Sequence, residues 1–253
     1  MKKSLQYRAE VVSFVVLSIV PTFVVLFIWT AVYGHTPSVH GYTLPALLQY
    51  FLIATLIANI ATCHFESELT LEVREGKIDH FLTKPLSYPM HIFTADIGEK
   101  IFRILFSLFF FTVFYIGLAR FFPLNHFDVT LLQVLEFTGL MIFSYSAEFA
   151  LSLITVLATF WFEGAEGLQH FKWIATTVLT GYMIPIVFMP TVIQKGILFL
   201  PFHYMYAMPI AVLQHSQVIT LIDVGSMALF LFFLYLIAFI LWKKAIVKYT
   251  SAA

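Results

Sequence analysis

The residue whose type and position most clearly suggest a chemical role is Glu148, which lies midway through the apolar stretch SYSAEFALSL. A carboxylate inside a membrane is costly, and a residue of this kind is a functional candidate by default. It could bind a cationic substrate, carry a proton, or pair with a neighbouring helix. Ser144, Ser146 and Ala147 beside it suit close packing of helices, so a purely structural role stays open.

Motifs of covalent catalysis and of nucleotide binding do not occur in the sequence. There is no G-x-x-x-x-G-K-[ST] loop, no H-E-x-x-H and no G-x-S-x-G. The group closest to a metal site is His64, Glu66 and Glu68, but this alternating spacing does not bring three ligands to one helical face. We predict no catalytic residue, no metal site and no cofactor in this chain.

A dense group of charges surrounds the stretch EVREGKIDHFLTKPLSYP, residues 72–89. Gly76 predicts a bend there, and Pro85 predicts the end of a short helix. Apolar residues at helical spacing predict that this helix is amphipathic; they are Leu71, Ile78, Phe81 and Leu82.

Two interpretations of this helix stay open. Helix-in-groove recognition of another protein uses such apolar anchors. A helix lying on the membrane is expected to have a mainly basic polar face, whereas residues 66–79 hold five acidic and two basic residues. Docking onto a partner is therefore favoured, and a solvated loop is the alternative.

Two further groups of charges are interpreted as ends of membrane helices. Asp96 and Lys100 are four residues apart, as are Glu99 and Arg103, which is the favourable order for ion pairs on a helix. We expect them at the foot of a span, at the level of the lipid headgroups. The stretch 163–172, with its glutamates and Lys172, is expected to form a solvated turn.

Composition indicates an integral membrane protein that holds these residues on helices. The 253 residues are 60% hydrophobic and 11% charged, with a mean hydropathy of +0.91, against about 25% charged in a typical globular protein. A span needs about 20 apolar residues, so we predict an all-α domain, residues 1–253, with six spans. The formal net charge is zero, which gives no reason to expect nucleic acid, and the lone Cys63 excludes an intrachain disulfide.

The predicted spans cover about residues 11–33, 44–63, a third that ends near 121, 137–161, 171–188 and 224–242. The first is too long for a signal peptide and lacks a following cleavage site. With the N-terminus in the cytoplasm, twelve of the fourteen Lys and Arg fall inside, and only Arg120 and Lys195 fall outside. The positive-inside rule therefore predicts that both ends and the 72–89 stretch face the cytoplasm.

The region between the fifth and sixth spans, residues 189–214, is apolar but interrupted by Pro190, Pro201 and Pro209. Each proline removes a backbone donor and resists a helix interior. Broken helices at membrane depth require protein or water to cover the freed backbone groups. We expect short re-entrant helices in the outer leaflet, with an ordinary loop on the membrane surface as the alternative.

These motifs together resemble the permeases of ABC type-2 transporters. The stretch EVREGKIDHFLTKPLSYP is similar to the family's cytoplasmic segment, with its glycine, Ile-Asp, leucine and Lys-Pro. The block FWFEGAEGLQHF…LTGYMIPIVFMPTVIQKGILFLPFHYMYAMPIAVL resembles the second half of the family, including a Gly-x-x-x-Pro followed by a proline-punctuated region. The resemblance covers essentially the whole chain, although the tail KKAIVKYTSAA lacks the glycine-rich ending of many relatives.

The resemblance implies a permease that forms a dimer with the same or a related chain and binds two copies of an ATPase subunit, which holds ATP and Mg. It assigns ATPase coupling to Glu75, Gly76, Ile78, Asp79, Leu82, Lys84 and Pro85. It places Gly181, Pro185 and Pro190 at the outer end of span five and the start of the re-entrant gate, which Pro201 and Pro209 continue.

We therefore expect the membrane subunit of an ATP-driven exporter in the cell membrane. An ion-coupled secondary transporter that uses Glu148 is the alternative, although the halves 1–126 and 127–253 show no evident repeat. A membrane-embedded enzyme acting on lipids is a third hypothesis, which the lack of a catalytic motif in the sequence disfavours.

Overall fold

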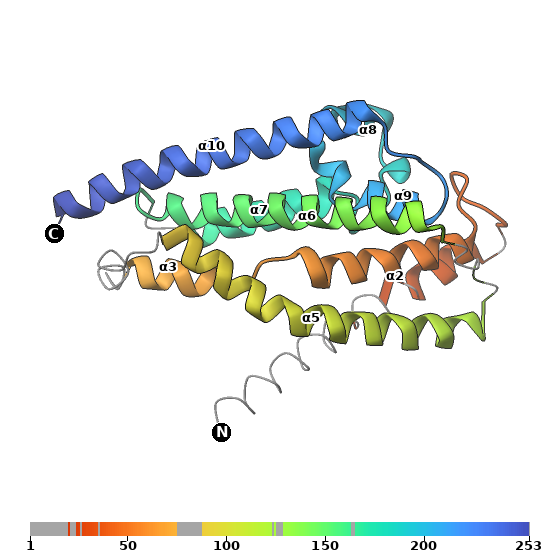
Figure 1. Ribbon diagram of the computed structural model, residues 1–253. Coiled ribbons are helices and arrows are strands. Elements are labelled where there is room, and N and C mark those ends of the chain that lie inside the picture. Colours follow the sequence, from red (N-terminus) through yellow and green to blue (C-terminus); the bar gives the residue numbers. More distant parts are fainter. Residues whose placement is uncertain are drawn as a thin grey trace, which may run out of the picture.

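The computed structural model describes residues 20, 24–25, 27–34, 36–74, 88–122, 124, 129–162 and 165–252 (Figure 1). These residues form helices, with one isolated β-bridge between Val39 and Tyr42, which confirms the all-α prediction. The helices are α2 (Leu44–Ala61), α3 (Glu66–Arg74), α5 (Tyr88–Ala119), α6 (Leu131–Ala158), α7 (Ala165–Leu179), α8 (Thr191–Phe199), α9 (Ala207–Leu213) and α10 (Leu221–Ala252), with 3-10 turns at Ile186–Phe188 and Pro201–Tyr204.

Four helical segments in the described part of the chain are long and apolar enough to cross a membrane. They are Leu44–Val73, which is interrupted at residues 62–65, Tyr88–Ala119, Leu131–Ala158 and Leu221–Lys248. They correspond to the second, third, fourth and sixth predicted spans. The first predicted span lies mostly outside the described residues, of which 27–33 are helical.

The fifth predicted span, residues 171–188, differs from the structure. Helix α7 starts earlier, ends at Leu179 and has 15 residues, or about 22 Å at 1.5 Å per residue. The chain then turns at Gly181, whose φ of +82° is a left-handed conformation that side chains disfavour. Apolar residues alone therefore overestimated the length of this helix at its C-terminal end.

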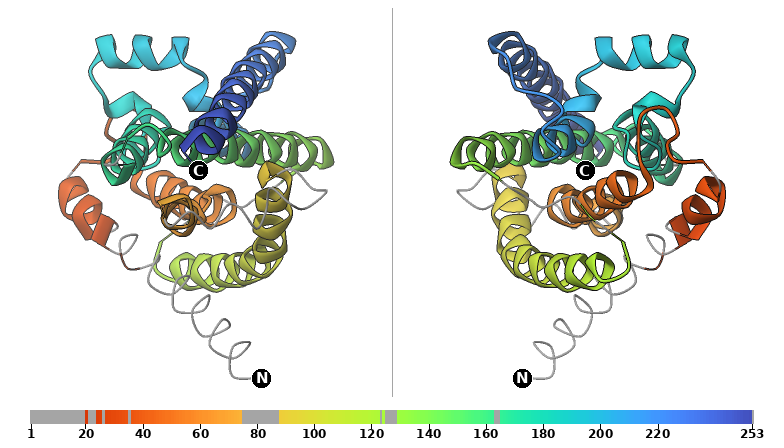
Figure 2. Two further views of the ribbon diagram at one scale, coloured as in Figure 1. Left: turned by 90° about the vertical axis from the view of Figure 1, so that its left-hand side faces the viewer. Right: turned by 90° about the vertical axis from the view of Figure 1, so that its right-hand side faces the viewer.

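The long helices form layers in which α6 and α7 lie between α2 and α5 on one side and α10 on the other (Figures 1 and 2). α2 and α6 are largely buried, whereas α5 and α10 expose large apolar side chains such as Phe102, Phe109, Phe232 and Phe239. Exposed apolar faces of this extent are stable against lipid rather than water.

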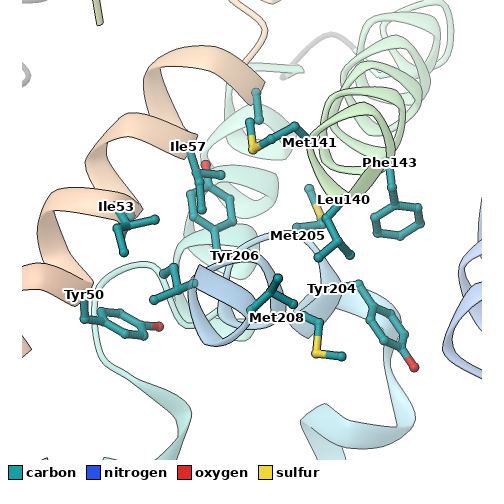
Figure 3. Packing of buried hydrophobic residues seen from close by; sticks show 14 of the residues in the cluster. Tyr50, Ile53, Ile57, Leu140, Met141, Phe143, Tyr204, Met205, Tyr206 and Met208 are labelled. Carbon is teal, nitrogen blue, oxygen red and sulfur yellow. The ribbon is translucent and has the colours of Figure 1, made fainter. Parts of the chain in front are cut away.

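The broken segment between α7 and α10 folds back into the bundle and completes its core. Figure 3 shows Ile53 and Ile57 of α2 directed toward Leu140 of α6, with Met205 and Met208 of the broken segment between the helices. These side chains are almost completely buried. The core therefore depends on a segment that is not itself a membrane-spanning helix.

Candidate functional site

A buried ammonium group joins three helices at one point. Lys172 of α7 donates through Nζ to Glu148 Oε1 of α6 at 2.6 Å, to Ser152 Oγ at 2.9 Å, and to Glu66 Oε1 at the start of α3. The side chains of Lys172, Glu148 and Glu66 are 11%, 8% and 12% exposed. A lysine has three donors, and these three oxygens engage all of them. We call these four residues the Lys172 cluster.

The Lys172 cluster changes the interpretation of two sequence features. Lys172 was expected in a solvated turn, but it is buried because α7 packs against α6 and α3. Glu148 lies beside the fully buried Ser144 and Ala147, as the small-residue pattern predicted, and it is held in an ion pair. A signal for Lys172 was present, because a lysine inside a predicted span calls for a buried partner.

A second group of polar residues, the Asp96 cluster, closes the end of α2. Lys100 Nζ of α5 donates to the carbonyl of Thr62 at 2.8 Å and lies 3.7 Å from Asp96 Oδ2. The Tyr145 hydroxyl donates to the same carboxylate oxygen at 2.8 Å, and the Cys63 thiol lies 3.8 Å from it. The predicted pairing of Asp96 with Lys100 is confirmed, but both side chains are 8% exposed rather than solvated at the headgroups.

The position of Lys100 has a physical cause in the break between α2 and α3. The last carbonyls of a helix have no partner within the helix and carry a partial negative charge. Lys100 supplies a positive charge there, since its ammonium also lies 3.5 Å from the carbonyl of Ala61. The next helix, α3, begins with Glu66 and Glu68 in its first turn, where the opposite end of the dipole favours anions.

A cavity of about 410 Å³ adjoins the Lys172 cluster. It lies between α2, the 62–65 break, α6 and α7, and the tyrosines of the broken segment contribute to its wall. Its lining is rich in hydroxyl groups and aromatic rings. The lining includes Thr55, Asn59, Thr62, Cys63, His64, Glu66, Ser67, Glu148, Lys172, Trp173, Thr176, Thr177, Thr180, Tyr182 and Tyr206.

His64 lines the cavity and contacts Arg103 of α5. Arg103 Nη1 lies 2.9 Å from His64 Nδ1, so this ring nitrogen accepts the hydrogen bond. The predicted partner of Arg103, Glu99, has a side chain that is not described. Among the residues that the structure describes, no three His, Cys, Asp or Glu are grouped to hold a metal ion.

The prolines predicted for the outer gate lie at or near the starts of the short helices in the broken segment, as expected. Pro185 and Pro190 directly precede the 3-10 turn Ile186–Phe188 and α8, Pro201 begins the next 3-10 turn, and Pro209 lies in α9. The carbonyl of Gly181 accepts a hydrogen bond of 2.6 Å from the Tyr50 hydroxyl of α2. The short broken helices are thus present, and their role as a gate stays a prediction.

The predicted ATPase-coupling residues lie outside the described part of the chain, which stops at Arg74 and resumes at Tyr88. This applies to Glu75, Gly76, Ile78, Asp79, Leu82, Lys84 and Pro85. The structure does describe α3, which leads directly into this stretch and whose first residue belongs to the Lys172 cluster.

The family model of the ABC-2 family transporter proteins matches residues 19–253. No curated protein and no solved structure matches the chain. The family match spans the whole described bundle, including the cavity and both polar clusters.

Proposed function

Because the chain belongs to the ABC-2 family of transporter proteins, we propose that it is the permease subunit of an ATP-driven exporter. In this proposal, a separate ATPase subunit binds ATP and Mg and hydrolyses the nucleotide. The permease makes no covalent change to its substrate. It works as a dimer with the same or a related chain in the cell membrane.

One observation supports this proposal beyond the family match: the helix that reaches the cavity, α3, ends directly before the coupling stretch. Glu66 lines the cavity and is the first residue of α3, and the last residue of α3, Arg74, directly precedes the coupling stretch. A helix of nine residues is about 13 Å long. A push on residues 75–85 would therefore reach the cavity wall through one short, rigid element.

The position of the cavity also suits uptake from the cytoplasm. With the predicted orientation, the 62–65 break and α3 lie toward the cytoplasmic side, and the cavity is lined by the last turns of α2. Movement of α3 would loosen Glu66 from Lys172 and change access to the cavity. On the outer side, the Tyr50–Gly181 contact would separate when the gate opens.

An ion-coupled secondary transporter is the alternative function, and it is less favoured because family membership implies an ATPase partner. In that alternative Glu148 would carry the proton and transport would follow a proton gradient without ATP. Reconstitution of the chain in vesicles with a proton gradient and no ATPase separates the two mechanisms.

The exporter proposal is tested by replacing Asp79 with Ala and Leu82 with Glu in the tagged full-length chain. We expect loss of co-purification with a co-expressed ABC ATPase subunit, because the change removes an apolar anchor and a charge from the docking helix. The matched control is Glu68→Gln, an exposed position on α3. Retained ATPase binding with coupled ATP hydrolysis would refute the assignment of this stretch.

A further inference from the structure

The cavity next to the Lys172 cluster has the size and lining of a ligand site. Its volume of about 410 Å³ lies within the range of roughly 300–1,000 Å³ that is usual for small-molecule pockets. We propose that it binds an organic ammonium ion, and that this is the class of substrate exported. The substrate role rests on the proposed function, whereas the binding itself does not.

The charge of the lining is the first argument for a cation. Glu66 and Glu148 contribute two carboxylates, and Lys172 is the single ammonium among the lining residues. Lys172 contacts one oxygen of each carboxylate, Oε1 in both cases. The cluster therefore has an excess of one negative charge, which a monovalent cation would neutralise. Charges interact more strongly in such a partly buried site than in water.

Arg103 is not among the residues that line the cavity. Its guanidinium donates to Nδ1 of the lining residue His64. Lys100 is likewise outside the lining; its ammonium donates to carbonyls at the end of α2 and lies close to the Asp96 carboxylate, which compensates its charge. Lys172 is thus the one described lysine or arginine that lines the cavity.

The aromatic lining is the second argument, and it favours an organic cation over a small inorganic one. Trp173, Tyr182 and Tyr206 come from α7 and from the broken segment, on the wall of the cavity. The face of an aromatic ring attracts ammonium groups within about 6 Å. Carboxylates together with such rings provide both a counter-charge and a surface for the apolar body of an amine.

The hydroxyl groups of the lining supply hydrogen-bond acceptors for the N–H groups of the ammonium. They come mainly from threonines of α2 and α7, among them Thr55, Thr176 and Thr177. Some of these hydroxyls already donate to backbone carbonyls one turn earlier, as Thr55 does to Phe51 at 2.8 Å. A hydroxyl that donates in this way keeps its lone pairs available as acceptors.

The test uses dansylcadaverine, a fluorescent primary amine, and its N-acetylated, uncharged derivative as the matched ligand control. Binding to the purified full-length chain in lipid nanodiscs is followed by the change in fluorescence. We expect the amine to bind about tenfold or more tightly than the amide, which corresponds to one charge-assisted contact. Equal binding of the two compounds would overturn the proposal and indicate a site for neutral polar molecules.

Two isosteric variants locate the site. Glu66→Gln and Glu148→Gln each remove the excess negative charge and should weaken binding of the amine about tenfold while leaving the amide unchanged. The controls are Glu68→Gln on α3 and Glu136→Gln on α6, which change the same charge on the same helices outside the cavity lining. Unchanged amine binding in both cavity variants, or an equal loss in the controls, would contradict the assignment.

Folding is checked in every variant by the thermal reactivity of the single cysteine, Cys63, which is buried. If a variant unfolds early, the comparison of amine with amide on the unmodified chain still decides the proposal. No ATPase is present in these measurements. A failure of ATPase association therefore leaves the binding result intact, and a failure of amine binding leaves the exporter assignment intact.

Discussion

Lys172 of α7 has an acceptor for each of its three N–H donors, two on α6 and one on α3. Breaking a buried ion pair by removing one partner costs about 3–5 kcal/mol, because the remaining charge is buried without compensation. In the Lys172 cluster, removal of the lysine leaves two carboxylates together. The ammonium is therefore expected to stabilise the folded state, whatever the cavity binds.

Lys172→Met is expected to lower the stability of the chain by about 3–5 kcal/mol. The measurement is thermal unfolding in detergent, followed with a thiol-reactive dye that reports the exposure of the buried Cys63. Lys195→Met is the matched control, because Lys195 is exposed on α8, and surface substitutions change stability by about 0.5 kcal/mol or less. Equal melting temperatures for both variants would show that the cluster contributes nothing to folding.

At the residue scale, the sequence predicted the isolated charges better than their partners. Glu148 was identified because one carboxylate in a long apolar stretch is rare. Glu66 and Lys172 were assigned to polar surroundings, because each lies near other charged residues in the sequence. Their pairing joins positions more than one hundred residues apart, and no periodicity within one helix can indicate such a contact.

At the element scale, the broken segment is stabilised by hydrogen bonds from the helices around it. The Ser144 hydroxyl of α6 donates to the carbonyl of Met205 at 2.8 Å. The backbone N–H of Ala207 donates to the carbonyl of Thr180 at 3.2 Å. The Gln133 side chain of α6 donates to the carbonyl of Val212. In the opposite direction, the Gln214 side chain at the end of α9 donates to the carbonyl of Ala46 in α2. Non-helical backbone is tolerated at membrane depth where protein covers it, and these contacts supply the cover.

The end of α7 depends on Gly181, which gives the second stability prediction. A Cβ at this position would lie 3.0 Å from the Tyr50 hydroxyl and 3.2 Å from Ile186 Cγ1. The left-handed backbone adds about 1–2 kcal/mol for any residue with a side chain. We therefore expect Gly181→Ala to lower stability by about 2 kcal/mol or more, again measured by thermal unfolding.

The control for Gly181→Ala is Gly196→Ala in α8. A Cβ there meets nothing within 4 Å, and alanine is favoured over glycine in a helix by about 1 kcal/mol. The two identical substitutions should therefore change the melting temperature in opposite directions. A similar loss at both positions would mean that the turn after α7 is not specifically tied to glycine.

Helix positions were predicted from apolar runs, and their ends were less accurate for identifiable reasons. The start of α6 was placed at residue 137, but Thr130 caps the helix with Gln133 in a capping box, and α6 begins at Leu131. The end of α7 was placed at residue 188, because residues after the glycine are apolar although they pack as a turn. Local capping and turn geometry decided both boundaries, rather than hydrophobicity.

At the scale of the whole molecule, burial separates two kinds of helix. α2 and α6 surround the core and the cavity, whereas α5 and α10 present apolar surfaces that lipid or another membrane chain can cover. The composition predicted an all-helical membrane protein from the excess of apolar residues. It did not distinguish central from peripheral helices, because both kinds are apolar enough to cross a membrane.

The ends of the bundle give the last prediction, which concerns orientation. Figure 1 shows α3 and the end of α10 at one end of the molecule, and α8 at the other. The α10 end carries Lys243, Lys244 and Lys248, whereas α8 carries Lys195 alone. Positively charged residues near helix ends are retained in the cytoplasm, so the α10 end is expected inside and α8 outside.

Cysteine labelling tests this orientation in a Cys63→Ser background, which is free of other cysteines. Lys195→Cys and Lys244→Cys both introduce a thiol at an exposed position. A membrane-impermeant maleimide should label Lys195→Cys in intact cells and Lys244→Cys only after permeabilisation. The reverse pattern would place α3 and residues 75–85 on the outer side, where no cytoplasmic ATPase could reach them. Labelling of both variants in intact cells would show that α10 does not cross the membrane once between residues 195 and 244.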